Sequence, residues 1–306
     1  MKVVMTGATG FVGTAVVRAL VARGDSIIAL SRDAERAKRV LGPDVTAVTA
    51  DLQQQGAWTA AVAGTDAVVH LAGESVSARR WDARQKQRIR DSRVEATRTL
   101  VEVITALPAS ERPRALISAS GSDYYPFAPD TEFDDEEVTE RDSPGDSFLA
   151  RVCRDWEAEA YAAEAAGLRV ACMRTGLVLG PGGALAKLKT PFQLFVGGRV
   201  GSGLQWTPWI HRDDAVRGYI AALADARYAG PINLVTGSVR NAELARAVGR
   251  SLGRPSWLPV PAFAVRAAVG ELSAYLLRGR RVMPSRLLEL GFRWTHPTLE
   301  VALAAS

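Results

Sequence analysis

The chain has 306 residues, of which 47% are hydrophobic and 23% charged, close to the averages for globular proteins. These values exclude a disordered chain, a collagen-like repeat and a small disulfide scaffold, and the length fits two structural units or one large α/β domain with an appendage. The net charge of +5 favours anionic ligands, but the basic residues lack aromatic interleaving, so we expect no nucleic-acid partner.

Cysteine usage and hydropathy indicate the compartment. The two cysteines, Cys153 and Cys172, are too few for a stapled secreted domain. No stretch reaches about 18 uncharged apolar residues, and residues 1–5 are too short for a signal-peptide core. We therefore expect a cytoplasmic protein without a membrane partner.

The first half alternates short β-branched runs with segments of helical period, the pattern of a parallel sheet with crossover helices. Helices are predicted from the first glycine loop to about residue 24, and near 33–41, 83–106 and 147–166. Strands are predicted at 2–6, 26–30, 45–49, 67–71, 115–118 and 168–174. The expected fold class is α/β, a Rossmann doubly wound parallel sheet.

After Thr175 glycine and proline punctuate the chain, which indicates substrate-binding loops. A helix at 213–226 and a strand at 231–235 return to the sheet, and residues 255–306 read as a last helical module. We assign residues 1–175 to the Rossmann domain, with its sheet completed by about 210–237. Residues 176–209 and 238–306 are assigned to a smaller C-terminal substrate-binding part.

A glycine loop follows the first strand. Its GxxGxxG spacing lies between a strand and a helix, so backbone N–H groups and the helix N-terminus can hold a pyrophosphate. The residues expected at the cofactor are Gly7, Thr9, Gly10, Phe11, Val12 and Gly13.

The end of the second strand favours NADP(H) over NAD(H). Ser31 and Arg32 stand where an NAD-selective chain usually has an acid, and an arginine there can pair with a 2′-phosphate. The alternative is that Arg32 is only a solvated loop residue and Asp33 a weak substitute for that acid. Further cofactor contacts are expected at the ends of the next two strands, from Asp51, Leu52, Leu71, Ala72 and Gly73.

Several longer motifs resemble the extended or atypical short-chain dehydrogenase/reductases, and among them the nucleoside-diphosphate-sugar epimerase-like family with its own C-terminal module. The resemblance runs nearly end to end. It rests on the glycine loop and on residues 71–74, 80–81, 87–93, 124–125, 155–157, 174–180, 209–211, 214, 258–261 and 270–271. It implies a Rossmann domain that binds NADP(H), with Glu74 near the cofactor, and a C-terminal part that closes over a small-molecule substrate. We expect a monomer or a homodimer.

The acid/base pair usual in this superfamily, a Tyr followed four residues later by a Lys, is absent. By the resemblance, Leu149 and Cys153 occupy those two places. Ser120 matches the catalytic Ser, and with Tyr124 and Tyr125 it forms our candidate catalytic set; the alternative is that both tyrosines only pack beside the nicotinamide.

Four further residues are expected to bind the substrate. Arg93 falls where many relatives have an active-site Asn and offers a cation to an oxyanion. Arg174, Trp209 and His211 border the glycine-rich segments 174–183 and 197–209, which we expect to close as a lid. The alternative is that the tryptophans only pin the C-terminal module to the sheet.

We expect no metal site. The spacing of the three histidines does not resemble a zinc motif, and the acidic stretch 130–142 is expected to be a surface loop.

These features leave alternatives for the function. The first is an NADP-dependent oxidoreductase or epimerase-like enzyme acting on a small polar carbonyl or carbinol compound, with a nucleotide sugar as one candidate. The others are an NADP-binding regulatory or sensor protein with reduced catalysis, and a reductase of a specialised metabolite.

Overall fold

A seven-stranded parallel sheet forms the centre of the computed structural model, which describes residues 1–127 and 135–306. The strand order is β10-β7-β5-β4-β1-β2-β3. The strands are β1 (Lys2–Thr6), β2 (Ser26–Ser31), β3 (Val45–Thr49), β4 (Ala67–His70), β5 (Ala115–Gly121), β7 (Arg169–Thr175) and β10 (Gly230–Leu234). The predicted Rossmann class is confirmed, since the order reverses beside β1 as in a doubly wound sheet.

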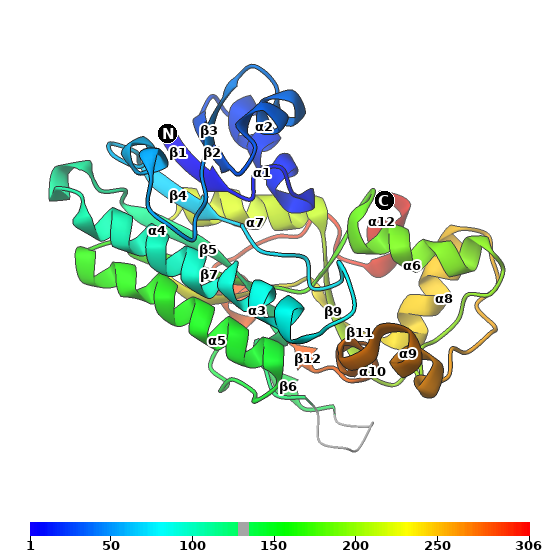
Figure 1. Cartoon of the computed structure of the whole chain (residues 1–306). Coiled ribbons are helices and arrows are strands. Elements are labelled where there is room, and N and C mark those ends of the chain that lie inside the picture. The colour runs from blue at the N-terminus through cyan, green and yellow to red at the C-terminus, as the bar shows by residue number, and fades with distance from the viewer. Residues whose placement is uncertain (128–134) are drawn as a thin grey trace.

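Helices cover both faces of this sheet (Figure 1). Along β1, Val3 and Met5 enter one core and Val4 the other, so both sides of the strand are buried. The first core includes α1 (Phe11–Ala22) and α7 (Arg212–Ala224), and the second includes α4 (Val94–Ala106) and α5 (Phe148–Tyr161). Helix α2 (Ala34–Leu41) connects β2 to β3.

The helix predicted at 83–106 is two helices. Helix α3 (Ala83–Asp91) ends before Ser92, and α4 begins after Arg93, whose φ of −113° and ψ of −63° depart from helical values. Ser92 Oγ accepts a hydrogen bond from the backbone N–H of Glu74 at 2.9 Å, which ties the break to the loop after β4. The segment predicted at 147–166 is α5 followed by a 3-10 helix, Ala162–Ala166.

The glycine-rich region contains regular structure that the sequence did not reveal. A second sheet has the order β11-β9-β8. Its strands are β8 (Leu177–Leu179), β9 (Trp206–His211) and β11 (Gly237–Arg240), and its helices are α6 (Gly183–Gln193) and α8 (Asn241–Ser251). These strands are short and lie close to glycine and proline residues, so their pattern resembles loops.

The C-terminal segment packs on both sheets. It contains α9 (Ala262–Val269), α10 (Ser273–Leu277), β12 (Arg281–Val282), α11 (Ser285–Glu289) and α12 (Leu299–Ala304). Strand β12 pairs with β6 (Glu137–Val138), which lies in the predicted acidic loop, and α12 contacts α8. Residues 130–134 of that predicted loop lie outside the described residues. Within the described ranges, no helix combines the length and apolar character needed to cross a bilayer.

Candidate functional site

The glycine loop forms a tight turn between β1 and α1. Gly7 has a φ of +65°, and a Cβ there would lie 2.5 Å from the backbone carbon of Leu71. A Cβ on Gly13 would lie 2.2 Å from the carbonyl oxygen of Gly7. The protein's own backbone therefore requires glycine at both positions.

Gly10 is less constrained than Gly7 and Gly13, because a Cβ there would make one tight contact and no clash below 3 Å. Its φ of −75° suits any residue, it is exposed, and the one neighbour of its Cβ position is Gly7 O at 3.1 Å. Gly10 is also the N-cap of α1, which has no side-chain cap and no acidic residue in its first turn. The first N–H groups of the helix are thus open to an anion that approaches the backbone closely, which fits a dinucleotide pyrophosphate.

The ends of β2 and β3 carry the groups expected at the ribose. Arg32 is exposed directly after β2. Asp33 caps α2, its carboxylate accepting a hydrogen bond from Arg36 N at 2.8 Å, so this oxygen is occupied. The hydroxyl of Ser31 bonds to the backbone of Asp33. After β3, Asp51 accepts hydrogen bonds from Gln53 N and the Gln54 side chain, and Leu52 packs on the core.

A buried network that sequence reasoning missed holds the ends of β1 and β4 together. Thr6 Oγ1 accepts hydrogen bonds from the N–H groups of Leu71 and Ala72, and lies 2.7 Å from His70 Nδ1. His70 Nε2 lies 3.0 Å from Thr97 Oγ1 on α4. Burial, and next the charge of Arg93, lower the pKa of His70 to about 4, so the imidazole is neutral at pH 7. The sequence signal that could have revealed this network is His70, a single histidine at the end of an apolar strand.

Arg93 lies beneath the loop that follows β4. A Cβ on Gly73 would lie 3.0 Å from its guanidinium carbon, and its Nη1 donates to the carbonyl oxygen of Glu74 at 3.0 Å. The guanidinium also stacks over Trp156, 5.3 Å from the ring centroid. The structure therefore brings Arg93, predicted to bind the substrate, into contact with Gly73 and Glu74, predicted to lie at the cofactor.

Ser120 belongs to a buried ionic network. Its hydroxyl donates to Glu157 Oε1 at 2.7 Å, and Glu157 accepts two further bonds from Arg174, at 2.8 Å each. Ser120, Glu157 and Arg174 are 5%, 4% and 3% exposed. We expected Arg174 to contact a substrate, but its guanidinium is paired with the carboxylate of Glu157. A buried carboxylate is stable only when a cation is paired with it.

Tyr125 extends this network. Its hydroxyl accepts from Arg174 Nη1 at 3.0 Å and donates to Asn233 Oδ1 at 2.6 Å, and burial raises its pKa. Tyr124 packs edge-on against Tyr125, with the Arg174 guanidinium 3.4 Å from its ring centroid. Burial also raises the pKa of Tyr124. The two candidate phenols thus lie together with Ser120, and at pH 7 both are protonated.

The places of the missing Tyr and Lys lie on α5. Leu149 is buried, and its backbone N–H donates at 2.8 Å to the hydroxyl of Tyr275, which comes from α10. The Cys153 thiol is buried, and this burial raises its pKa to about 12, so it is not a thiolate at pH 7. Tyr275 is a further phenol at this site, and no sequence signal placed it there.

Asp123 lies at the same corner, in the short helix Ser122–Tyr124 that follows β5. Its side chain is exposed, yet desolvation by the surrounding protein raises its pKa to about 6, with Arg93 opposing the shift. Asp123 was not among the site residues predicted from the sequence.

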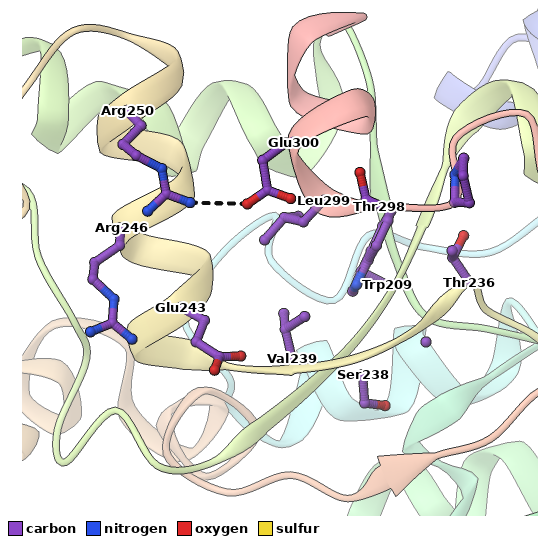
Figure 2. A pocket seen from close by; sticks show the side chains of 12 residues that line it. Trp209, Thr236, Ser238, Val239, Glu243, Arg246, Arg250, Thr298, Leu299 and Glu300 are labelled. Atoms are coloured by element: carbon purple, nitrogen blue, oxygen red, sulfur yellow. Dashed lines mark hydrogen bonds and ion pairs between the residues drawn. The ribbon is translucent and has the colours of Figure 1, made fainter.

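Trp209 lines a cavity of about 600 Å³ between β9, β11, α8 and α12 (Figure 2). Polar lining is supplied by Ser238, Glu243 and Arg246, while Arg250 is paired with Glu300 at 3.0 Å. None of the residues that line it belongs to the glycine loop or to the Ser120 network. Of the four predicted substrate residues, only Trp209 borders this cavity.

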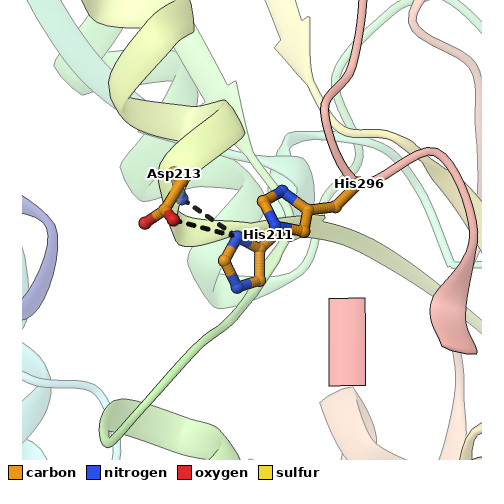
Figure 3. Close-up of side chains that lie close together, drawn as sticks. All are labelled: His211, Asp213 and His296. Atoms are coloured by element: carbon orange, nitrogen blue, oxygen red, sulfur yellow. Dashed lines mark hydrogen bonds and ion pairs between the residues drawn. The ribbon is translucent and has the colours of Figure 1, made fainter. Parts of the chain in front are cut away.

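His211 is fully buried and stacks on His296, with ring centroids 3.7 Å apart (Figure 3). With Asp213, the pair offers ligand atoms within 4.8 Å of one another that could hold a metal, which the sequence spacing did not suggest. Both Nδ1 atoms already have partners: His211 accepts from Asp213 N at 3.2 Å, and His296 contacts Asp214 at 3.1 Å. His211 Nε2 is buried without a partner among the described residues.

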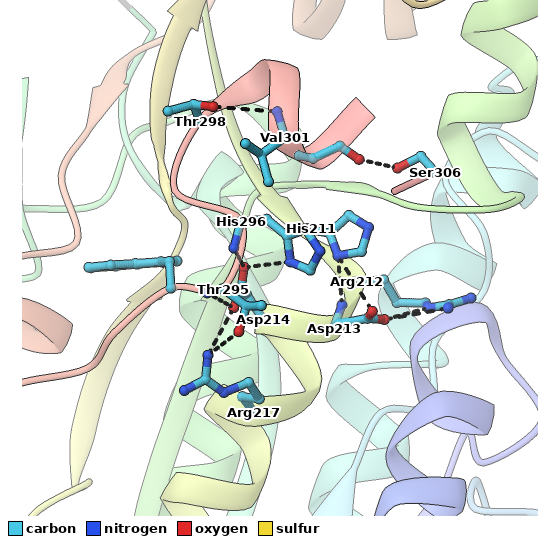
Figure 4. A network of polar contacts seen from close by, with 12 residues as sticks. His211, Arg212, Asp213, Asp214, Arg217, Thr295, His296, Thr298, Val301 and Ser306 are labelled. Atoms are coloured by element: carbon cyan, nitrogen blue, oxygen red, sulfur yellow. Dashed lines mark hydrogen bonds and ion pairs between the residues drawn. The ribbon is translucent and has the colours of Figure 1, made fainter. Parts of the chain in front are cut away.

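Asp214 ties the C-terminal segment to α7 (Figure 4). Its buried carboxylate accepts hydrogen bonds from the backbone N–H groups of Thr295 and His296, at 2.6 and 2.8 Å. The contacts of Asp214 and the stacked histidines therefore join β9 and α7 to the segment that precedes α12.

Comparison with known proteins places this architecture in a family. Residues 3–234 match the model of the NAD dependent epimerase/dehydratase family, and residues 260–306 match a domain of unknown function, DUF1731. The chain belongs to the NAD dependent epimerase/dehydratase family. The predicted resemblance is confirmed, and the C-terminal module of the prediction corresponds to DUF1731.

Relatives within this family match the whole chain. An Arabidopsis thaliana protein, the chloroplastic homolog of epimerase family protein SDR39U1, is 40% identical over 100% of this chain and 86% of its own length. The crystal structure of human SDR39U1 (isoform 2) with NADPH is 34% identical, with a TM-score of 0.86 over 99% of this chain and 98% of that chain. A nucleoside-diphosphate sugar epimerase from Corynebacterium glutamicum is 32% identical, with a TM-score of 0.78 over 100% of this chain and 57% of that chain.

Proposed function

We propose that this family member binds NADP(H) and is an oxidoreductase or epimerase-like enzyme acting on a small polar carbonyl or carbinol compound, with a nucleotide sugar as one candidate. The observation that carries the proposal is the uncapped N-terminus of α1 at exposed Gly10, where a Cβ would contact one atom of the protein, Gly7 O at 3.1 Å. The absence of a side chain there lets a pyrophosphate approach the helix N–H groups closely. The human relative crystallised with NADPH supports this reading.

Bound NADPH would supply a hydride, and the chain's own residues would do the rest. Gly10 and the first N–H groups of α1 would hold the pyrophosphate, and exposed Arg32 would pair with the 2′-phosphate. Arg93, beneath Gly73, would stabilise negative charge at a substrate oxygen. Ser120 and Tyr125, bonded to Glu157 and Arg174, would hold the wall of the site in place.

A second candidate is an NADP(H)-binding regulatory or sensor protein. It is favoured by the occupied hydrogen-bonding groups of Ser120 and Tyr125 and by Leu149 and Cys153 in the usual Tyr and Lys places.

The cytoplasmic location stays a prediction.

One set of assays distinguishes the enzyme from the regulatory or sensor protein. We expect the purified chain to oxidise NADPH with some members of a panel of small aldehydes, ketones and quinones, or, with NADP⁺, to interconvert a nucleotide sugar and its epimer. Tight NADPH binding in calorimetry with neither reaction favours the sensor, and the absence of NADPH binding contradicts both.

A further inference from the structure

Among the titratable groups at the ends of β4 and β5, Asp123 is the one that the proposed function leaves unused. Ser120 and Tyr125 are buried and hydrogen-bonded, and Cys153 is held as a thiol. Asp123 is exposed, and its carboxyl makes no hydrogen bond with any residue in the described ranges. A desolvated carboxyl that is open to solvent and free of partners is available for proton transfer.

The strand register places Asp123 at the edge where a ligand would bind. His70 of β4 pairs with Ser118 of β5, and Gly73 and Gly121 each follow three residues later. A Cβ on Gly121 would lie 3.9 Å from Asp123 Oδ2, and one on Gly73 would lie 3.0 Å from the Arg93 guanidinium carbon. The carboxyl and guanidinium thus lie at adjacent strand ends, outside which open α/β sheets bind their ligands.

Among the residues that the structure describes, groups from three elements face Asp123. Arg93 precedes α4 and attracts the carboxylate. Cys153 on α5 has its Sγ 3.4 Å from the same Gly121 Cβ position, and burial raises its pKa to about 12. Tyr275 on α10 also interacts electrostatically with Asp123, and its pKa is raised by burial. At pH 5–8 the thiol and the phenol stay protonated, so Asp123 is the group of this corner that titrates.

We propose that Asp123 exchanges the reacting proton with the substrate oxygen, in place of the missing Tyr and Lys, and that Arg93 steadies the oxygen as charge develops on it. This inference rests on the proposed NADP(H)-dependent function. In reduction, the carbonyl carbon gains the hydride that NADPH supplies, and the carbonyl oxygen gains the proton of the Asp123 carboxyl. The products are an alcohol, NADP⁺ and the Asp123 carboxylate, which regains a proton from water. In oxidation each transfer is reversed.

The direction of the pH dependence follows from these roles. Reduction needs protonated Asp123, so kcat/KM for reduction falls as the pH rises through about 6, whereas oxidation needs the carboxylate and becomes faster over the same range. A phenol donor with a raised pKa, such as Tyr124, would leave reduction independent of pH between 5 and 8.

Cofactor binding tests the position of Asp123 without turnover. NADP⁺ carries a positive nicotinamide ring and NADPH a neutral one, while their phosphates titrate alike. A carboxylate beside the ring therefore strengthens NADP⁺ binding relative to NADPH as the pH rises from 5 to 8, by about fivefold or more. Calorimetry should show this change in wild type and in Asp44→Asn, an exposed control, and not in Asp123→Asn. An equal pH dependence in wild type and Asp123→Asn, or none in wild type, overturns the proposal.

Turnover tests the proton transfer, with 9,10-phenanthrenequinone as the carbonyl probe. We expect Asp123→Asn to lower kcat by at least roughly tenfold and to remove the pH dependence, and Asp123→Glu to restore part of both. Full activity of Asp123→Asn, with loss of activity in Tyr124→Phe, would assign the proton to the phenol instead. If wild type binds both cofactors but reduces nothing in the panel, the enzymatic function fails, while the binding comparison still decides whether Asp123 lies beside the ring.

Discussion

Gly10 and Gly13 stand three residues apart in one loop, but they are glycine for different reasons. Gly10→Val should lower NADPH affinity by at least roughly tenfold while lowering the free energy of unfolding by only about 1 kcal/mol, because its Cβ would make one tight contact, with Gly7 O at 3.1 Å, at a helix N-cap. Calorimetry and urea denaturation measure the two quantities. Gly13→Ala is the matched comparison, and it should lose stability as well, since its Cβ would meet Gly7 O at 2.2 Å. Undiminished NADPH affinity in Gly10→Val would refute the pyrophosphate position.

Arg32 should decide between the two nicotinamide cofactors. Arg32→Ala removes a charge-assisted contact to the 2′-phosphate, worth about 1.5–3 kcal/mol, so NADPH affinity should fall by roughly 10- to 100-fold while NADH affinity stays nearly unchanged. Arg18→Ala, an exposed arginine on α1, serves as the control for net charge. Equal losses for both cofactors in Arg32→Ala would show that the residue acts elsewhere.

The sequence identified the residues of this site that belong to local motifs, and it missed those that act through tertiary contacts. The glycine loop could be predicted because its spacing lies within one turn between a strand and a helix. Asp123 could not, because its pKa is raised by the protein that the fold packs around it, with Arg93 opposing the shift. Tyr275 reaches Leu149 from the far end of the chain, and no local pattern encodes that contact.

At the scale of elements, α5 and β7 are joined by the buried pair of Glu157 and Arg174. Glu157→Gln should destabilise the fold by about 3–5 kcal/mol, because it leaves a buried guanidinium without its counter-charge. The matched control on the same helix is Glu159→Gln, whose surface ion pair with Arg98 should contribute less than about 1 kcal/mol. Urea denaturation compares the two variants. Similar small losses in both would mean that the buried pair does not hold these elements together.

The helices and strands were predicted most accurately where their sequence pattern is strong. The strands β1 and β3 were predicted with the bounds that the structure has, because each is a short run rich in β-branched residues. Strand β9 was predicted as a loop, since its sequence contains Pro208 and follows several glycines. The break between α3 and α4 was missed because it depends on the contact of Ser92 with the Glu74 backbone.

At the scale of the molecule, backbone hydrogen bonds join the glycine-rich segment to the C-terminal module, so we expect the two to move together. Val260 N donates to Arg199 O at 2.8 Å, and Gly201 N donates to Val260 O at 2.9 Å. Chymotrypsin can probe both partners, at exposed Phe195 and Trp257. We expect NADPH with a substrate to slow cleavage at both sites by a similar factor, as for a lid that closes. Equal cleavage rates in every state would make this region a fixed part of the core.

The central claim, that the chain uses NADPH for hydride transfer, is tested most directly by deuterium at C4 of the nicotinamide. Both stereospecifically labelled forms of NADPH are incubated with the protein and the carbonyl panel, and the products are analysed by mass spectrometry. We predict that one labelled form gives an alcohol carrying one deuterium on the former carbonyl carbon, and that Gly10→Val gives none. Saturable NADPH binding without deuterium in any product would contradict the claim and identify the chain as an NADP(H)-binding protein without this chemistry.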